Sequence, residues 1–193
     1  MDHSPSSPRL EEQFEIFNED NSKVVGLMPR SVVHRDGFLH RAVNVIVLNS
    51  QEQVLLQKRA SSKDVCPSCW DISCAEHLTP GETYEQAVIR GLAEELSIKI
   101  EPLHLRNGAL SCMRPAALFK YDDPIKNVKD YEFTECWKFV YDGDWQIDKN
   151  EVQEAALFPI AEVARMAAEN KELFTPWGLR EISYFLRLCR IIR

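Results

Sequence analysis

Apolar and polar positions predict several strands in the first third of the chain. A β-branched run at 42–48 is typical of a buried strand, and a second apolar run at 54–59 follows it after a polar turn. We predict that these two runs are adjacent strands of a core sheet. Upstream, residues 14–17 alternate as a short strand and residues 23–27 suit a second one, so the pattern predicts a hairpin within 13–30.

The clearest helical pattern in the first half of the chain begins after Thr83. Thr83 and Gln86 have the spacing of a capping box, in which each side chain satisfies a backbone N–H of the other residue. Apolar side chains then recur at helical spacing, at Tyr84, Val88, Leu92 and Leu96. We predict an amphipathic helix whose apolar face packs on the sheet.

The second half of the chain contains further strand and helix patterns. They predict strands at 105–113, 133–141 and 155–158 and helices at 160–168 and 176–192. The last helix would have Thr175 as its N-cap and Pro176 at its first position. The segment from Cys112 to Lys129 is expected to be a loop. Residues 1–12, rich in serine and proline, are predicted to be a disordered tail before one domain at 13–193.

Composition and charge exclude several classes of protein. The chain has 193 residues, of which 45% are apolar and 27% charged, the balance of a globular protein. Its net charge of −7 lacks a basic footprint, so we expect no nucleic acid polymer as a partner. No apolar run approaches the roughly 18 residues of a membrane span, and the first residues lack the apolar core of a signal peptide. The sequence therefore predicts a cytoplasmic protein with no membrane partner.

Acidic side chains gather on and beside the helix predicted after Thr83. They are Glu82, Glu85, Glu94 and Glu95, and Arg90 lies one turn before Glu94. Oxygen ligands from a helix and the loop before it suit magnesium, which is usually held by a few carboxylates and substrate phosphates. The same spacing also fits a solvated helix face crossed by salt bridges. Charge spacing alone leaves both interpretations open.

The residues around this helix resemble the signature of the Nudix hydrolases. That signature runs glycine, five residues, glutamate, seven residues, arginine, glutamate, an apolar residue, any residue, two glutamates, any residue, glycine and an apolar residue. The positions in register here are Glu82, Arg90, Leu92, Glu94, Glu95 and Ile98. Other positions depart from the signature, because Glu76 stands at its first glycine, Gly91 at the glutamate after arginine and Ser97 at its last glycine.

This resemblance implies an α/β fold, the Nudix-type α/β/α sandwich with a central mixed β-sheet, in which the Nudix box covers about 76–98. It also implies a hydrolase that depends on Mg²⁺ (or Mn²⁺). Its substrate would be a nucleoside diphosphate or related small molecule, whose diphosphate linkage a metal-activated water attacks. By the same resemblance Glu94, Glu95 and Glu82 hold the metal ion, and Arg90 orients a carboxylate.

The resemblance also suggests residues outside the box. Glu151 or Glu154, ahead of the last predicted strand, corresponds to a distal acid that some members use as a ligand or base. Arg41, Lys58 and Arg59 are candidates for contacts with substrate phosphate, because cationic side chains suit phosphate oxygens. A solvent-facing position fits these three side chains equally well.

A second interpretation comes from the C-terminal Phe174-Thr175-Pro176, which is similar to the branch related to isopentenyl diphosphate isomerase. Those enzymes also lack the glutamate that Gly91 replaces, and they hold a metal ion with histidines and glutamates near a cysteine. The corresponding positions here are His34, His40, His77 and Glu135. The position of the catalytic cysteine corresponds to Ala75, with Cys74 one residue early. The isomerase therefore ranks below the hydrolase.

A third interpretation is a catalytically weak Nudix fold that binds a diphosphate ligand or a protein partner. It follows from Glu76, Gly91 and Ser97 together, since these residues depart from the signature. Under each interpretation we expect a small-molecule diphosphate as the first ligand to test. A homodimer is compatible with the sequence.

Overall fold

A computed structural model describes residues 11–63 and 65–190 of the chain, so the predicted tail at 1–12 lies mostly outside the described residues. The strands are β1 (Gln13–Phe17), β2 (Val24–Pro29), β3 (His40–Leu48), β4 (Gln53–Arg59), β5 (Trp70–Asp71), β6 (Cys74–His77), β7 (Leu110–Asp123), β8 (Val128–Val140) and β9 (Val152–Pro159). The helices are α1 (Arg30–Asp36), α2 (Tyr84–Leu96), α3 (Pro102–Arg106), α4 (Ile160–Glu169) and α5 (Pro176–Leu188), with a short 3-10 helix at Lys171–Leu173.

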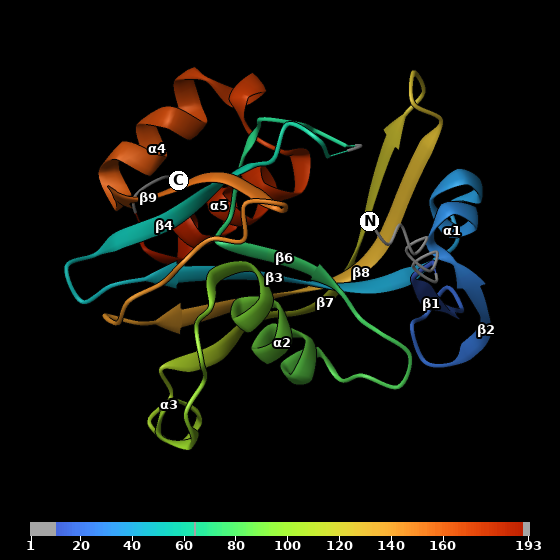
Figure 1. Cartoon of the computed structure of the whole chain (residues 1–193), viewed down its shortest axis with the longest axis horizontal. Coiled ribbons are helices and arrows are strands. Elements are labelled where there is room, and N and C mark those ends of the chain that lie inside the picture. The colour runs from blue at the N-terminus through green and yellow to red at the C-terminus, as the bar shows by residue number, and fades with distance from the viewer. Residues whose placement is uncertain (1–10, 64, 191–193) are drawn as a thin grey trace, which may run out of the picture.

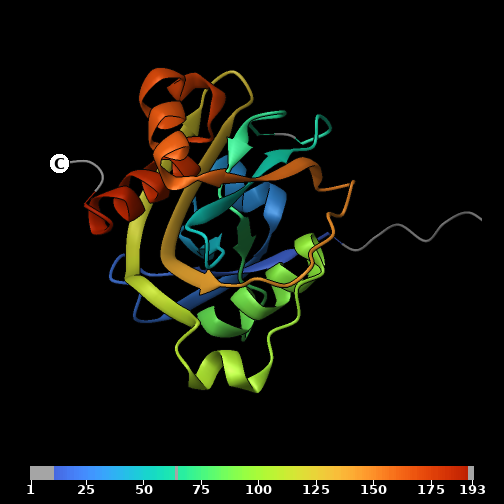
Figure 2. The same ribbon diagram turned by 90° about the vertical axis from the view of Figure 1, so that its left-hand side faces the viewer.

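A mixed sheet lies between two layers of helices. In the described part of the chain it has seven strands, in the order β5-β4-β3-β8-β7, with β6 added to β3 and β9 to β4. Strands β3 and β8 run parallel, and the other pairings are antiparallel. Helix α2 covers one face, whereas α4 and α5 cover the other (Figures 1 and 2). The predicted α/β fold with a central mixed sheet is confirmed.

Strand β3 has two apolar faces because successive side chains point to opposite sides of a sheet. Val43, Val45 and Val47 belong to the core on the α2 side, where Leu92 is fully buried. Ile46 belongs to the core under α4 and α5. Burying a side chain such as Leu92 contributes about 1.5–3 kcal/mol, so packing on both faces fixes the helical layers.

Strands β3 and β4 separate soon after the turn that joins them. Within the described residues one pair, Leu48 and Val54, joins these strands. Beyond that pair β6 extends along β3, while β9 extends along β4. The Ser73 hydroxyl bridges the fork, since it accepts from the Val47 backbone N–H at 2.8 Å and donates to the Leu55 carbonyl. Residues of both branches, among them Asn44 of β3 and Arg59 of β4, line the cavity described below.

Helix α2 begins as the sequence predicts. Thr83 is its N-cap, and the reciprocal capping box with Gln86 is present. Its C-cap is Ser97, whose φ of 55° and ψ of 21° are left-handed. Glycine adopts this conformation without steric cost, whereas a residue with a Cβ does not. Ser97, one of the departures from the signature, is therefore strained.

We expect Ser97→Gly to raise the free energy of unfolding by about 0.5–1 kcal/mol, because relief of the left-handed strain exceeds the entropy lost from a more flexible unfolded chain. Urea unfolding would show a higher midpoint at unchanged slope. Ser97→Ala is the matched control, since alanine keeps the Cβ. Equal midpoints for the two variants would contradict the explanation.

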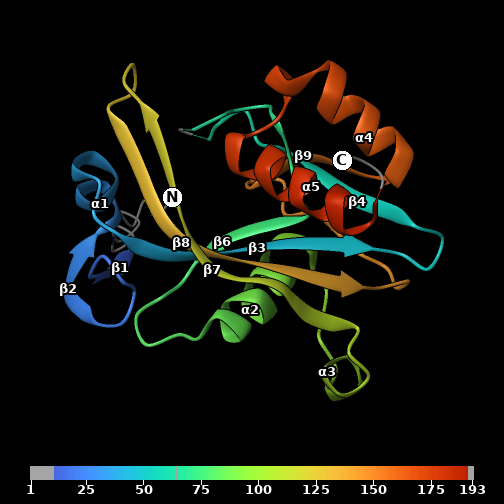
Figure 3. The same ribbon diagram turned by 180° about the vertical axis from the view of Figure 1, so that it is seen from behind.

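Several sequence-based boundaries were wrong. Leu105 lies in α3 rather than in the predicted strand 105–113. The segment from Cys112 to Lys129, expected to be a loop, forms most of β7 and the turn into β8. Figures 1 and 3 show this long hairpin rising between α1 and α5. Alternating exposed and half-buried side chains weakened its strand pattern. The last helix ends at Leu188, earlier than predicted, and 191–193 lie outside the described residues.

The N-terminal hairpin is confirmed, with β1 and β2 paired antiparallel. Helix α1, which follows it directly, was not predicted, because seven residues give too short a pattern. Phe14 of β1 and Val33 of α1 are buried together, with Met28 packed against them. No helix in the described ranges is long and apolar enough to cross a membrane.

Candidate active site

One cavity of about 1050 Å³ opens between the N-terminal segment, the β3–β4 fork and the tip of the β7–β8 hairpin. It is lined mainly by polar and charged side chains. Its acidic residues include Glu76, Glu95, Asp130, Glu132 and Glu151, and its basic residues include Arg30, His34, Arg59, Lys63 and His77. The cavity therefore has the mixture of charges that a metal ion and a phosphorylated ligand require.

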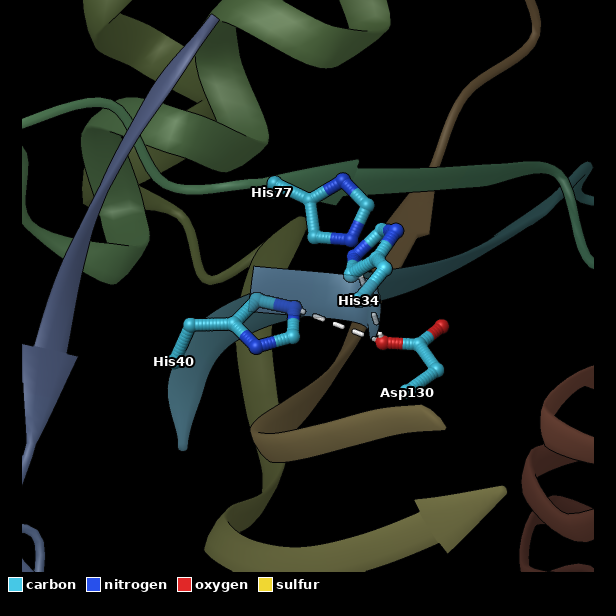
Figure 4. A group of neighbouring side chains, drawn as sticks. All are labelled: His34, His40, His77 and Asp130. Atoms are coloured by element: carbon cyan, nitrogen blue, oxygen red, sulfur yellow. Dashed lines mark ion pairs between the residues drawn. The ribbon is translucent and has the colours of Figure 1, made fainter. Parts of the chain in front are cut away.

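A histidine cluster lies at one end of this cavity. We define it as His34 of α1, His40 at the start of β3, His77 at the end of β6 and Asp130 of β8. These residues each offer a ligand atom, and all these atoms lie within 4.8 Å of one another. Figure 4 shows the imidazole rings gathered around the Asp130 carboxylate.

Two carboxylates connect the rings of the histidine cluster. Asp130 Oδ1 lies 3.6 Å from His34 Nε2 and 3.4 Å from His40 Nε2. Glu132 Oε1 lies 3.1 Å from His77 Nε2 and 3.7 Å from His40 Nε2. Asp130 and Glu132 are two residues apart on β8, so both point to the same side of the sheet.

The protonation of these histidines suits metal binding. The Nδ1 atom of His40 lies 3.0 Å from the Phe38 carbonyl, and a carbonyl only accepts, so Nδ1 carries a proton and Nε2 is the atom that faces the cluster. Burial lowers the pKa of His34 to about 4 and that of His77 well below its usual range. The Nε2 atoms of all three rings are buried without a hydrogen-bond partner. Buried imidazole nitrogens without a partner fit a divalent transition metal.

The cluster differs from the predicted set in its carboxylate. Glu135 accepts a hydrogen bond from Trp137 Nε1 at 2.8 Å and does not line the cavity. It lies an odd number of residues from Asp130 and Glu132 on β8, and therefore on the other face of the strand. The structure thus brings together the three predicted histidines, with Asp130 and Glu132 in place of Glu135. The sequence signal that could have found Asp130 and Glu132 is their spacing of two residues on a strand that lies beside a strand carrying a histidine.

Arg90 organises the loop before α2. Its Nε and Nη2 atoms donate to the two oxygens of Glu82, each at 2.9 Å, and Nη2 also donates to the His77 carbonyl. Glu82 accepts from the Thr79 backbone N–H as well. Both oxygens of Glu82 are therefore engaged in holding the loop, and Glu82 does not line the cavity, so the structure does not bring it to the predicted metal site.

Glu94 and Glu95, adjacent in the signature, lie in different environments. Glu94 is 59% exposed at its side chain, pairs with Arg90 at 3.1 Å and does not line the cavity. Glu95 is buried and lines the cavity. Gln57 Nε2 donates to Glu95 Oε2 at 2.8 Å. Burial and the nearby charge of Glu76 raise the pKa of Glu95 to about 8.

Of the predicted distal acids, Glu151 lines the cavity and Glu154 does not. Glu151 directly precedes β9 and pairs with Lys63, which also lines the cavity. The ammonium group of Lys63 further interacts with the charges of Glu95 and Glu76. Sequence reasoning missed Lys63 as a site residue, because a lysine in a loop has no periodic pattern.

Of the three side chains predicted to contact phosphate, one lines the cavity and two do not. Arg59 lines the cavity, and its guanidinium lies 3.6 Å from the buried Asp71. Lys58 points away and lies over the Trp70 ring. Arg41 donates to Asn21 from two of its nitrogens and stacks 3.8 Å from the centre of the Phe17 ring. Arg41 thus holds the N-terminal hairpin against β3 and does not line the cavity.

The sequence matches the family described as NUDIX domain over residues 38–178. The chain belongs to the Nudix family. An isopentenyl-diphosphate Delta-isomerase 1 of Photorhabdus laumondii is 32% identical over 90% of this chain and 98% of its own length. Nudix hydrolase 3 of Arabidopsis thaliana is 43% identical over 47% of this chain and 12% of its own length. The crystal structure of DR0079 from Deinococcus radiodurans has a TM-score of 0.60 and 28% identity, covering 82% of this chain and 90% of the other.

This Nudix chain has a cavity without a cysteine among its described lining residues. Ala75 lines the cavity, whereas Cys74, its neighbour on β6, is fully buried and points to the α2 side of the sheet. Burial also raises the pKa of the Cys74 thiol well above its usual range. The predicted offset therefore sends the thiol away from the cavity.

Proposed function

We propose that this Nudix chain is a divalent-metal-dependent hydrolase that cleaves the diphosphate linkage of a nucleoside diphosphate or related small molecule. The observation that carries the proposal is the meeting of Glu95, Glu151, Arg59 and Lys63 at one cavity. Carboxylates hold a hard cation, while the guanidinium and ammonium groups bind phosphate oxygens.

The residues at this end of the cavity fit a magnesium or manganese ion. Glu95 offers a carboxylate, and the buried Oε1 atom of Gln57 beside it has no hydrogen-bond partner. A bound divalent cation neutralises phosphate oxygens and lowers the pKa of the attacking water. Glu95 would hold that ion, with Gln57 fixing the orientation of the Glu95 carboxylate through its N–H donor.

The cationic side chains explain how substrate and base could be coupled. Lys63 pairs with Glu151. A bound diphosphate would draw Lys63 and Arg59 to its own oxygens, because phosphate carries more negative charge than one carboxylate. Glu151 would then be free to accept the proton of the attacking water.

A second candidate function, isomerisation of a small isoprenoid diphosphate, is favoured by the histidine cluster and by the isomerases among the relatives. This reaction needs a proton donor beside a carbon–carbon double bond. Glu132 is a candidate donor, since burial and the neighbouring Asp130 raise the pKa of Glu132 well above its usual range. The cavity lining lacks the thiol of those enzymes at position 75, which ranks this function second.

The two functions are separated by a combined phosphorus and proton NMR time course. Purified protein with Mg²⁺ or Mn²⁺ is mixed with nucleoside diphosphates, sugar nucleotides and isopentenyl diphosphate. We expect new phosphate resonances without allylic proton signals. Allylic signals without phosphate release would replace the first function with the second, and unchanged spectra with every substrate would contradict both.

We expect Lys63→Met to raise the KM of the reaction about 10-fold or more, because a hydrogen bond to a charged group contributes about 1.5–3 kcal/mol. Lys58→Met is the matched control, since Lys58 lies nearby in the chain but over the Trp70 ring. Equal KM values for the two variants would contradict the placement of phosphate at Lys63.

A further inference from the structure

Two departures from the Nudix signature meet in space. The signature has glycine at the position of Glu76 and glutamate at the position of Gly91, so this chain has the two residue types exchanged. Glu76 lies on β6, and Gly91 lies in the middle of α2, which packs against β6. A mid-helix glycine costs about 1 kcal/mol relative to alanine, so helix propensity does not explain Gly91.

Packing explains it. A Cβ atom at Gly91 would lie 2.8 Å from Cys74 Sγ, 3.1 Å from Glu76 Cβ and 3.3 Å from Glu76 Cγ. The first distance is shorter than real contacts allow, and the others are tight. The Cys74 and Glu76 side chains together therefore occupy the space beside α2 into which a side chain at position 91 would project. Glycine at 91 makes room for Cys74 and for glutamate at 76.

We propose that Glu76 supplies, from strand β6, the metal-binding carboxylate that Gly91 leaves out of helix α2. The two glutamates that line this part of the cavity would then be Glu76 and Glu95, one from each element. This assignment rests on the proposed metal-dependent function and names a ligand that the family signature does not contain.

The surroundings of Glu76 support this role. Its side chain is 18% exposed, and its Oε2 atom lies 3.3 Å from Arg90 Nη1. Its Oε1 atom accepts from the His77 backbone N–H at 2.9 Å, so the carboxylate is fixed on two sides. Arg90, which the resemblance implies orients a carboxylate, thus contacts Glu76 as well as Glu82 and Glu94.

An independent observation points to a cation site beside Glu95. Gln57 is 3% exposed, its Nε2 donates to Glu95 Oε2, and its Oε1 has no partner. An oxygen buried without a partner is costly, and a cation would satisfy it.

Manganese binding tests the assignment without any substrate. Mn²⁺ is titrated into the full chain, free Mn²⁺ is measured by electron paramagnetic resonance, and Mg²⁺ is added in excess. The fraction that Mg²⁺ displaces reports oxygen ligands, because Mg²⁺ competes poorly for imidazole. We expect Glu76→Gln to weaken this displaceable binding about tenfold or more. Glu85→Gln, an exposed change on helix α2, is the control.

An exchange of the two residues makes the test sharper. Glu76→Gly alone is expected to weaken Mn²⁺ binding, and Gly91→Glu alone to destabilise the fold through contact with Glu76 and Cys74. The double variant Glu76→Gly with Gly91→Glu, made in a Cys74→Ala background that also removes the Sγ contact, restores the arrangement of the signature and is expected to recover displaceable binding. Circular dichroism of each variant checks the fold.

The outcomes separate this assignment from the proposed function. Weak binding by Glu95→Gln together with unchanged binding by Glu76→Gln would overturn the role of Glu76 while leaving the function intact. Unchanged binding by both variants would overturn both. A folded double variant that binds Mn²⁺ no better than Glu76→Gly would also overturn the assignment.

Discussion

Replacing Glu95 with glutamine is expected to remove activity and, in the metal-free protein, to raise the free energy of unfolding at pH 8. Burial and the charge of Glu76 raise the pKa of Glu95 from 4.5 to about 8 in the folded protein. Between these values the unfolded chain is charged at this residue while the folded protein is neutral. The folded state therefore holds the extra proton, and stability decreases as the pH rises through this window.

Glutamine removes this penalty and keeps an oxygen that can accept from Gln57. We expect the difference in free energy of unfolding, variant minus wild type, to increase by about 1.4 kcal/mol for each pH unit above 4.5, up to the folded-state pKa of Glu95. Urea unfolding in the presence of a chelator at pH 5 and pH 8 measures the difference. Glu85→Gln, on the same helix but exposed, is the matched control.

The same substitution should abolish metal-dependent behaviour. Loss of a residue that only supports a ligand costs about 10–100-fold in affinity or activity, so loss of Glu95 should lower kcat/KM by more than about 100-fold. Mn²⁺ should raise the melting temperature of the wild type more than that of the variant, since a cation that binds the folded state stabilises it. A stabilised variant with full activity would exclude Glu95 as a ligand.

The sequence predicted the elements with long, regular patterns. The β-branched run of β3 and the capped, periodic helix α2 were found because each follows a single sequence pattern along most of its length. Helix α2 carries Arg90 and Glu95, so the positions of these two side chains followed from the same pattern. The Nudix signature added the chemistry that periodicity could not.

Residues whose roles depend on long-range pairing were harder to predict. Glu135 was predicted as a ligand from its position relative to the family. On β8 it lies on the opposite face from Asp130 and Glu132. A shift of one residue along a strand is enough to reverse the face. Glu94 carries the right residue type but points outward to Arg90. The partnership of Glu76 with Gly91 depends on the contact between β6 and α2. Such contacts are properties of packing and have no local signal.

Acid is expected to unfold the metal-free protein through the histidine cluster. Burial lowers the pKa of His34 from 6.5 to about 4. Between these values the unfolded chain binds a proton that the folded protein does not, so stability is lost as the pH falls through this window. Glu95 acts in the opposite direction above pH 4.5, and the informative quantity is therefore the difference between wild type and His34→Asn.

We expect the wild type to lose about 2 kcal/mol relative to His34→Asn between pH 6.5 and pH 5, because one displaced pKa contributes about 1.4 kcal/mol per pH unit. Chemical unfolding of both proteins at several pH values measures this difference. His104→Asn, on α3 outside the cavity, is the control. Protons and a divalent metal compete for the same Nε2 atoms, so stabilisation of the wild type by Mn²⁺ should fade over the same pH range. Parallel stability curves for wild type and His34→Asn would show that His34 stays accessible to protons in the folded protein, which would contradict its buried place in the cluster.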